Sequence, residues 1–268
     1  SDGVSKTPCC GGPRNGFPQS SLRLPLIRSD PLDYPPYIML IHRKAVASVL
    51  LILLLSCTTA SATFVHTPYS GAPSLHSITI SWASNEPVPA VVEYGPRAAF
   101  EAGGMLSQSV SVPKPGEDAT PTTHMTLEGL DANTDYAYRV VLGDGEDRSS
   151  SDVGYFSTAP EPGTPVSFAV LSDTQWQSEG INRLQMVGDA IAADPMPFDF
   201  ILHAGDIVES PSSPYWDHWF SSFSAMLQRA PFLPVLGNHE KNHYSYYQTF
   251  TLPPGGGKYD KRWWSLHW

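Results

Sequence analysis

The sequence predicts two domains in one chain, an all-β sandwich followed by an α/β domain. From about residue 64 to 160, short alternating segments are separated by turn residues, and no helical run interrupts them. From residue 166 to 240, apolar strands alternate with amphipathic helical stretches, which is typical of parallel strands joined by right-handed crossovers. The linker "TAPEPGTP" (158–165) contains three prolines, so we place the domain boundary near Pro160.

A secretory leader is predicted over residues 39–62. It has a basic patch at residues 42–44, an apolar run from Ala45 to Leu55, and a small-residue stretch ending in "TTASA". The apolar run has 11 residues, whereas a membrane span needs about 20, so we favour a signal peptide over a span or a buried core helix. "LLSC" (54–57) is similar to a lipoprotein cleavage box, which would lipidate Cys57; cleavage after Ala62 is the alternative.

Residues 1–38 contain seven prolines and no periodic apolar pattern, so we expect an unstructured segment upstream of the leader. The predicted domains are therefore 63–160 and 161–268. All three cysteines, at positions 9, 10 and 57, precede the cut after Ala62, so the exported part would have no disulfide. We expect the protein to be periplasmic, secreted, or an outer-surface lipoprotein.

Charge narrows the range of partners. Residues 63–268 carry 10 basic and 23 acidic side chains, which gives a net charge of 10 − 23 = −13. A negative field of this size disfavours nucleic acid and anionic lipid as partners and favours multivalent cations. Membrane contact is expected only through the signal peptide or a lipid anchor at Cys57. The sequence does not indicate an oligomeric state.

The sandwich strands are expected where apolar and polar residues alternate. The segments are "SITISW" (77–82), "AVVEYG" (90–95), "HMTLEGL" (124–130), "TDYAYRVVL" (134–142) and "VGYFSTAP" (153–160). In "LEGLDANTDYAYRV", the spacing up to Tyr136 resembles the corner of fibronectin type III domains in which a tyrosine hydroxyl bonds back to the preceding loop. That resemblance makes Tyr136 the corner tyrosine; an ordinary strand aromatic is the alternative.

The α/β domain is predicted from three strands and two helices. Its strands are "VSFAVLSD" (166–173), expected to be buried on both faces, "FDFILHAGD" (198–206) and "PFLPVLGNHE" (231–240). The helices are 181–194, with Ile181, Leu184, Val187 and Ile191 at helical spacing, and 215–230. The second helix has aromatic residues that we assign to the core: Trp216, Trp219, Phe220 and Phe223.

Each predicted strand ends in polar residues. Asp173 and Gln175 follow the first, Asp206 the second, and Asn238 and His239 the third. Because parallel strands end at one edge of the sheet, these side chains should converge, with the two carboxylates and the Asn238 amide within roughly 4–7 Å of one another.

Carboxylate and amide oxygens suit hard or borderline divalent cations. Two ions about 3.5–4 Å apart can clamp a phosphoryl group while a bridging hydroxide attacks phosphorus in line. Asp206 has two oxygens with which to bridge such ions, and His239 can steady the developing charge or protonate the leaving oxygen.

"D-x-Q", "GD-x-x-E" and "GNHE", in this order, resemble the first three motifs of calcineurin-like metallophosphoesterases. The preceding fibronectin type III-like sandwich makes the purple acid phosphatase type the nearest match. The resemblance implies an α/β domain with four α/β/β/α layers, of which residues 161–268 are the N-terminal part. It also implies that Asp173 binds one metal ion, Asp206 bridges two, Asn238 binds the other, and His239 contacts phosphate.

Two positions depart from the family pattern. Glu209 stands where purple acid phosphatases have a ferric-binding tyrosine, which favours a pair of divalent ions (Mn, Fe or Zn) over violet ferric chemistry. Gln175 stands where histidine is common, so it is either a weaker oxygen ligand or a donor behind the ligands. The downstream histidines and the "GHxH" motif of the family are missing, so we expect a C-terminally truncated domain with poor metal affinity and little turnover.

Other polar residues are weaker candidates. His203 lies on an apolar strand and is assigned to the core rather than to a metal, and His218 and His243 are assigned to the surface near the site. The segment 253–264 is either a substrate loop with phosphate-attracting cations, or an ordinary solvated loop. Its cations are Lys258, Lys261 and Arg262.

The sequence thus predicts an acid phosphatase-like hydrolase of small phosphate esters. The alternatives are an exported nucleotidase or phosphodiesterase with the same metal site, and a non-catalytic surface protein that binds through its fibronectin-like domain.

Overall fold

The computed structural model describes residues 61–116, 119, 121–145, 147–175 and 182–268. The predicted upstream segment, and the leader apart from Ser61 and Ala62, lie outside the described residues, and so does Cys57. Within the described ranges, no helix is both long and apolar enough to cross a bilayer.

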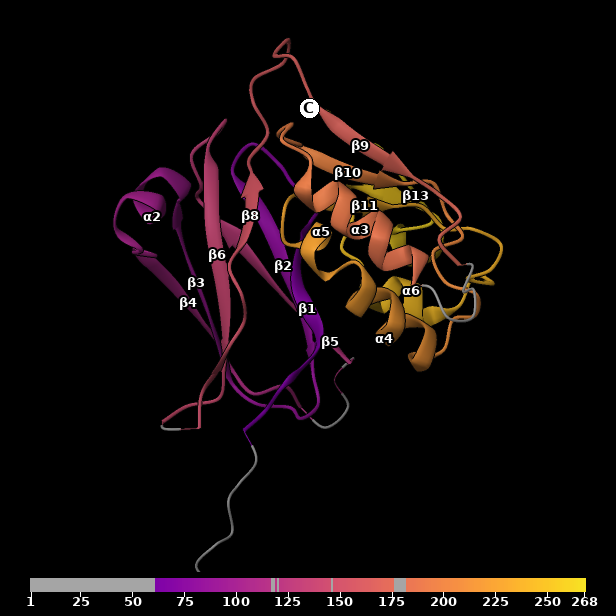
Figure 1. Cartoon of the computed structure of the whole chain (residues 1–268), viewed down its shortest axis with the longest axis horizontal. Helices are drawn as coiled ribbons and strands as arrows, with labels where there is room; N and C mark the ends of the chain where they lie inside the picture. The colour runs from indigo at the N-terminus through magenta and orange to yellow at the C-terminus, as the bar shows by residue number, and fades with distance from the viewer. Residues whose placement is uncertain (1–60, 117–118, 120, 146, 176–181) are drawn as a thin grey trace, which may run out of the picture. The chain divides into compact units, whose positions relative to one another are not determined.

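The first domain is a β-sandwich of two antiparallel sheets (Figure 1). One sheet has the order β1-β2-β5, with β1 (Phe64–Gly71), β2 (Ser77–Ser84) and β5 (Thr122–Glu128). The other has the order β4-β3-β6, and β7 and β8 both pair with β6. Its strands are β3 (Ala90–Pro96), β4 (Gln108–Val112), β6 (Asp135–Leu142), β7 (Ser149–Ser150) and β8 (Gly154–Ser157).

The alternating residues of these strands form the sandwich core. Ile78, Ile80 and Trp82 of β2 are almost completely buried, and they belong to one cluster with Val92 of β3. At the corner before β6, the Tyr136 hydroxyl accepts a hydrogen bond from the backbone N–H of Asp131 at 3.0 Å. The bond back to the preceding loop that was expected of a corner tyrosine is therefore present.

One helix in the sandwich was missed by the sequence analysis. The helix α2 (Arg97–Gly103) directly follows β3. Its sequence, RAAFEAG, is rich in alanine, and Arg97 pairs with Glu101 one turn later at 2.7 Å. Gly104 ends it with a positive φ of 69°, a conformation that glycine adopts at little cost.

The second domain has a parallel sheet of order β11-β10-β9. The strands are β9 (Phe168–Leu171), β10 (Phe200–His203) and β11 (Phe232–Pro234), and the helices are α3 (Arg183–Ala193), α4 (Ser213–Ser222), α5 (Ser224–Leu227) and α6 (Tyr244–Thr249). Figure 1 shows α3, α4 and α5 along one face of this sheet. A short hairpin of β12 (Gly255–Gly256) and β13 (Trp263–Trp264), with the 3-10 turn η1 (Lys258–Asp260), completes the described chain.

Three details of the α/β domain differ from the expectations. The helix expected over 215–230 is divided between α4 and α5 at Phe223. There α3 approaches so closely that a Cβ on Gly188 would lie 2.9 Å from the Ser222 carbonyl oxygen. Val187 does not face the core; it is 45% exposed, and Leu184 and Gly188 are the buried residues of α3.

The strand β9 was expected to be buried on both faces, and this expectation is wrong. Ala169 and Leu171 pack against the core under the helices, but Phe168 and Val170 point to the opposite face, and Val170 is 61% exposed. Among the described residues β9 pairs only with β10, and α3, α4 and α5 lie along one face of the sheet (Figure 1). A continuous apolar run therefore does not by itself establish burial on both sides.

The two domains share part of one core. Tyr69 of β1 is 1% exposed and belongs to the cluster formed mainly by the α/β domain, where its ring lies 5.2 Å from that of Phe220. His66, also on β1, stacks on Phe220 with ring centroids 4.1 Å apart. The first sandwich strand thus packs against α4 as well as against its own sheet.

Candidate metal centre

The loops that follow the three parallel strands converge, as the sequence predicted. The backbone N–H of Asp173, after β9, donates to the Gly205 carbonyl oxygen at 3.1 Å, one residue before Asp206. The backbone N–H of His239 donates to Asp206 Oδ1 at 2.9 Å, one residue after Asn238. Residues separated by more than 30 positions in the sequence therefore meet at one edge of the sheet.

Glycines make this convergence possible. A Cβ added to Gly237 would lie 2.1 Å from the backbone nitrogen of Asp206 and 2.2 Å from its Oδ1. A Cβ on Gly205 would lie 2.9 Å from the Cα of Gly237. Both distances to Asp206 are far below van der Waals contact, so the loop after β11 can approach Asp206 only because residue 237 has no side chain.

The two aspartates have unusual backbone conformations. Asp173 has φ 55° and Asp206 has φ 53°, in the left-handed region that costs a non-glycine residue roughly 1 kcal/mol or more. Positive φ angles at two neighbouring carboxylates are consistent with a functional site, where such conformations are concentrated.

The oxygen atoms available at this edge fit a hard divalent cation. Asp206 uses Oδ1 for the His239 N–H, which leaves Oδ2, and Asp173 receives a bond on Oδ2 from the Ser172 hydroxyl at 2.5 Å. Asn238 is exposed. Among the described residues, the side-chain oxygen of Gln175 is buried and has no hydrogen-bond partner, as expected of an oxygen that binds a cation when one is present.

Within the part of the chain that the structure describes, no three His, Cys, Asp or Glu side chains form a cluster that could hold a metal ion. A cation at this edge would therefore depend on the amide oxygens as well as on the two carboxylates. Amides carry no charge, so such a set binds a divalent ion more weakly than one with further anionic ligands.

His239 is held in one orientation. Its Nδ1 lies 3.1 Å from the Glu209 carbonyl oxygen, so Nδ1–H donates and Nε2 is left for another partner. This bond, aided by the carboxylates of Asp206, Glu209 and Glu240, raises the pKa of His239. The Glu209 carboxylate itself lies 3.7 Å from Nδ1. Without metal, this imidazole therefore stays protonated to a higher pH than an ordinary histidine.

Glu240 has a role that the sequence analysis missed. Its carboxylate is completely buried and accepts three backbone N–H groups: Oε1 from Ile207 at 2.8 Å and Val208 at 3.0 Å, and Oε2 from Gly237 at 2.8 Å. Glu240 thereby ties the loop after β10 to the loop after β11. An acidic residue immediately after "GNH" was visible in the sequence, but its partners were not.

A second network lies beneath the site. His203 is 1% exposed; its Nδ1 accepts the Gly205 N–H at 3.2 Å, and its Nε2 lies 2.9 Å from the Thr174 hydroxyl. Thr174 also accepts a bond from the Trp219 indole and donates to the Ile207 carbonyl, each at 2.9 Å. Burial lowers the pKa of His203 to about 4. His203 is the satisfied core histidine that we expected, and Thr174 is a structural residue that we missed.

The other basic candidates contact the protein itself. The Lys258 ammonium donates to the Asn242 carbonyl at 3.2 Å, and the Lys261 ammonium donates to the Tyr247 carbonyl at 2.7 Å. Burial lowers the pKa of Lys261. His243 uses Nδ1 at the start of α6, and His218 is half-buried on α4. Arg262 is exposed.

Comparison with known families agrees with this arrangement. Residues 63–158 match the family described as purple acid phosphatase, N-terminal domain, and residues 166–267 match the calcineurin-like phosphoesterases. This chain belongs to the calcineurin-like phosphoesterases of the purple acid phosphatase type. Asp173, Asp206 and Asn238 all lie within the phosphoesterase domain.

Individual relatives of this chain are distant. The uncharacterized protein Rv2577 of Mycobacterium tuberculosis is 26% identical over 224 residues, covering 70% of this chain and 41% of that protein. Purple acid phosphatase 22 of Arabidopsis thaliana is 25% identical over 184 residues, covering 67% and 38%. The chain thus spans about two fifths of the length of these curated relatives.

Solved structures share the fold. The structure of PhoD has a TM-score of 0.57 at 16% identity, and the match covers 78% of this chain and 49% of PhoD. The purple acid phosphatase PPD1 from yellow lupin has a TM-score of 0.57 at 18% identity, covering 75% and 42%. At these identities the likeness establishes the sandwich followed by the α/β domain, and no more.

Proposed function

We propose that the protein is an exported hydrolase of phosphate esters, acid phosphatase-like, that works with two divalent cations. Membership of the phosphoesterase superfamily supports a hydrolase in general. The observation that supports this site most directly is the pair of contacts at the sheet edge, from Asp173 N–H to Gly205 and from His239 N–H to Asp206.

In this proposal Asp173, Gln175, Asp206 and Asn238 hold the cations, with Asp206 between them. The unpartnered oxygen of Gln175 and the second oxygen of Asp206 fit that task. When bound, a pair of divalent cations would withdraw charge from phosphorus and supply a nucleophilic water at neutral pH. Manganese, iron and zinc all accept such ligands; Glu209 in place of a tyrosine favours a divalent pair.

The chain's own contribution to catalysis is assigned to His239. Its Nδ1–H is fixed on the Glu209 carbonyl, so Nε2 is the nitrogen that would meet a phosphate oxygen. In the protonated imidazole this nitrogen carries a proton, which suits binding of an anion and proton donation to the leaving alcohol. Glu240 keeps this loop in register by binding the N–H groups of both strand tips.

Manganese binding tests the assignment without relying on turnover. We expect weak binding by the wild-type chain in calorimetry, and an affinity at least about tenfold lower for Asp206→Asn. His239→Gln is the matched control, since it removes the proposed phosphate contact and no ligand, and its manganese affinity should be unchanged. Equal affinities of wild type and Asp206→Asn would contradict the proposal.

Gln175 offers a sharper form of the same test. Because its oxygen has no partner, Gln175→Met should change the free energy of unfolding by no more than about 0.5 kcal/mol without metal. With manganese present, the same variant should bind roughly tenfold more weakly. A loss of stability without metal would instead assign Gln175 to the fold.

Activity assays separate the remaining functions. With manganese, an acid phosphatase should hydrolyse p-nitrophenyl phosphate, whereas a phosphodiesterase should prefer the bis-ester and a nucleotidase should prefer nucleoside monophosphates. Absence of hydrolysis together with absence of manganese binding would favour a non-catalytic binding protein.

A further inference from the structure

A cavity of about 600 Å³ lies between the sandwich and the α/β domain. Its sandwich wall is formed by the start of β1 and the end of β2, including His66 and Asn85. Its other wall is formed by the N-terminal ends of α4 and α6, including Ser212, Asp217 and Tyr244. This volume lies within the usual range of small-molecule sites, about 300–1,000 Å³.

The charge of the cavity disfavours anionic ligands such as phosphate esters. Among the described residues that line it, none is lysine or arginine, and Asp217 is the only carboxylate. His66 Nε2–H donates to Asp217 Oδ1 at 2.8 Å. Burial lowers the pKa of His66, so the imidazole is neutral near pH 7 and leaves the carboxylate charge uncompensated. A phosphate group would be repelled here.

Several polar groups in the cavity retain hydrogen-bonding capacity. Asp217 uses one oxygen for His66 and has a second for another donor. Ser212 is the N-cap residue of α4, but its hydroxyl makes no capping bond. Asn85 accepts the Thr63 N–H through its oxygen at 2.8 Å, so its NH₂ group remains a donor. Together they offer an acceptor, a donor and a hydroxyl group that can serve as either.

An aromatic side chain lies beside these groups. Tyr244, the first residue of α6, is 55% exposed, and its ring centroid lies 4.1 Å from that of His243. His243 is itself held by the backbone N–H of Ser245 at 3.3 Å. A supported, exposed aromatic ring provides a flat apolar face with a negative quadrupole, which suits the C–H face of a sugar ring.

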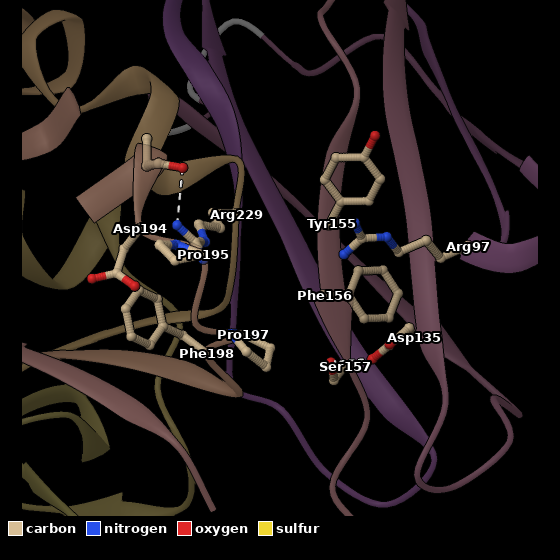
Figure 2. Close-up of a pocket in the computed structure, with 11 residues that line it drawn as sticks. Arg97, Asp135, Tyr155, Phe156, Ser157, Asp194, Pro195, Pro197, Phe198 and Arg229 are labelled. Carbon is tan, nitrogen blue, oxygen red and sulfur yellow. Dashed lines mark hydrogen bonds between the residues drawn. The ribbon is translucent and has the colours of Figure 1, made fainter. Parts of the chain in front are cut away.

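A second cavity between the domains has charged side chains on both walls. It measures about 360 Å³ and has an arginine on each wall (Figure 2). Arg229 is bound to the carbonyls of Ile191, Ala192 and Met196. Arg97 pairs with Glu101 and stacks 4.5 Å from the Tyr155 ring. Both arginines of that cavity are therefore engaged by the protein itself, and its charges do not suit an uncharged ligand.

We propose that the larger cavity binds an uncharged carbohydrate, with Tyr244 stacking on a sugar ring and Asp217, Ser212 and Asn85 binding its hydroxyl groups. None of the candidate metal ligands, Asp173, Gln175, Asp206 and Asn238, lines this cavity. The inference does not depend on metal binding or on phosphatase activity.

Saturation-transfer NMR and calorimetry with maltose, cellobiose and lactose test this proposal. We expect at least one disaccharide to bind the wild-type chain below roughly 10 mM. Tyr244→Ala and Asp217→Asn should each weaken binding about tenfold or more. Tyr259→Ala is the matched control, because Tyr259 is also an exposed tyrosine but lies on η1, away from the cavity, and its binding should equal that of wild type.

Three results would overturn the proposal: no disaccharide binds, Tyr244→Ala and Tyr259→Ala bind equally well, or choline binds more tightly than any sugar. The last would make the cavity a site for organic cations, since Asp217 and Tyr244 also suit a positive charge. Far-ultraviolet circular dichroism of each variant shows whether it is folded. Ser212→Ala, at an exposed residue whose hydroxyl makes no capping bond, provides a further variant that should leave the fold intact.

Discussion

The two domains of this chain differ in how complete their cores are. The sandwich buries Trp82, Tyr138 and Phe156 in a cluster made only of its own residues. The α/β domain also has an aromatic core, with Trp219 and Phe220, but it includes Tyr69 from the sandwich. The core of the α/β domain, which carries the candidate site, therefore depends on β1 of the sandwich. Among the described residues, the sandwich core includes no residue of the α/β domain.

The largest expected effect comes from removing this shared residue. Tyr69→Ala deletes a fully buried ring that packs against Phe220 and Phe250, and should cost about 3–5 kcal/mol of unfolding free energy. Hydrogen exchange should rise in α4 and α6 as well as in β1. Phe156→Ala, within the sandwich core, is the control. It should be equally destabilising, but it should raise the hydrogen exchange of sandwich amides and not that of α4 and α6. Unchanged protection of α4 and α6 in Tyr69→Ala would show that the α/β core is independent.

Acid should affect the α/β domain through His203. Its pKa is about 4 in the folded protein, against about 6.5 in the unfolded chain, so the unfolded chain binds more protons between these values. This contribution to stability is complete above pH 6.5 and is lost as the pH falls towards 4, by about 3 kcal/mol in total.

Denaturation by urea at a series of pH values, without metal, measures this effect. Burial also lowers the pKa of His66 and His124, so the informative quantity is the difference in pH dependence between wild type and His203→Gln. A variant with the same pH dependence as wild type would show that His203 does not set the acid sensitivity.

Substitution of Glu240 is expected to lower the free energy of unfolding less than substitution of Tyr69. Glu240, however, holds the two loops of the candidate site together. Glu240→Gln replaces one of two acceptor oxygens by a donor that would face a backbone N–H, at a cost of about 2–3 kcal/mol. The control is Glu209→Gln at an exposed position, which should stay within about 0.5 kcal/mol. Thermal unfolding compares them. Similar melting temperatures for the two variants would argue against the bond network.

The smallest effect concerns the sandwich alone. Tyr136→Phe removes the acceptor of the Asp131 N–H and should cost about 1 kcal/mol. Tyr94→Phe is the control, since Tyr94 is a buried tyrosine in the same cluster. If both variants lose the same stability, the corner bond has no special weight.

The arrangement of the candidate site was largely predictable from sequence because parallel strands place their ends on one edge. Asp173, Asp206 and Asn238 needed only their positions after apolar runs to be grouped. The core assignments of Trp216, Trp219, Phe220 and Phe223 followed in the same way from helical spacing.

What could not be predicted depends on contacts distant in the sequence. Glu240 binds the backbone N–H of Ile207, which lies 33 positions away, and no local sequence pattern predicts that hydrogen bond. The role of Tyr69 could not be predicted because β1 packs against both β2 and α4. The alternation of apolar and polar residues does not show which face of β1 meets the α/β domain. α2 was missed because seven residues are too few to establish a helical period.

The close approach at Gly237 has a consequence for how the site can vary. The loops after β10 and β11 can lie this close together only because Gly237 has no Cβ. Even the methyl group of alanine would overlap Asp206. The surrounding side chains can be exchanged to tune affinity or substrate choice while the frame stays in place, but a change at this one position would move the frame itself. In an engineered version of the protein, the side chains around the site could therefore be substituted, whereas Gly237 would have to be kept.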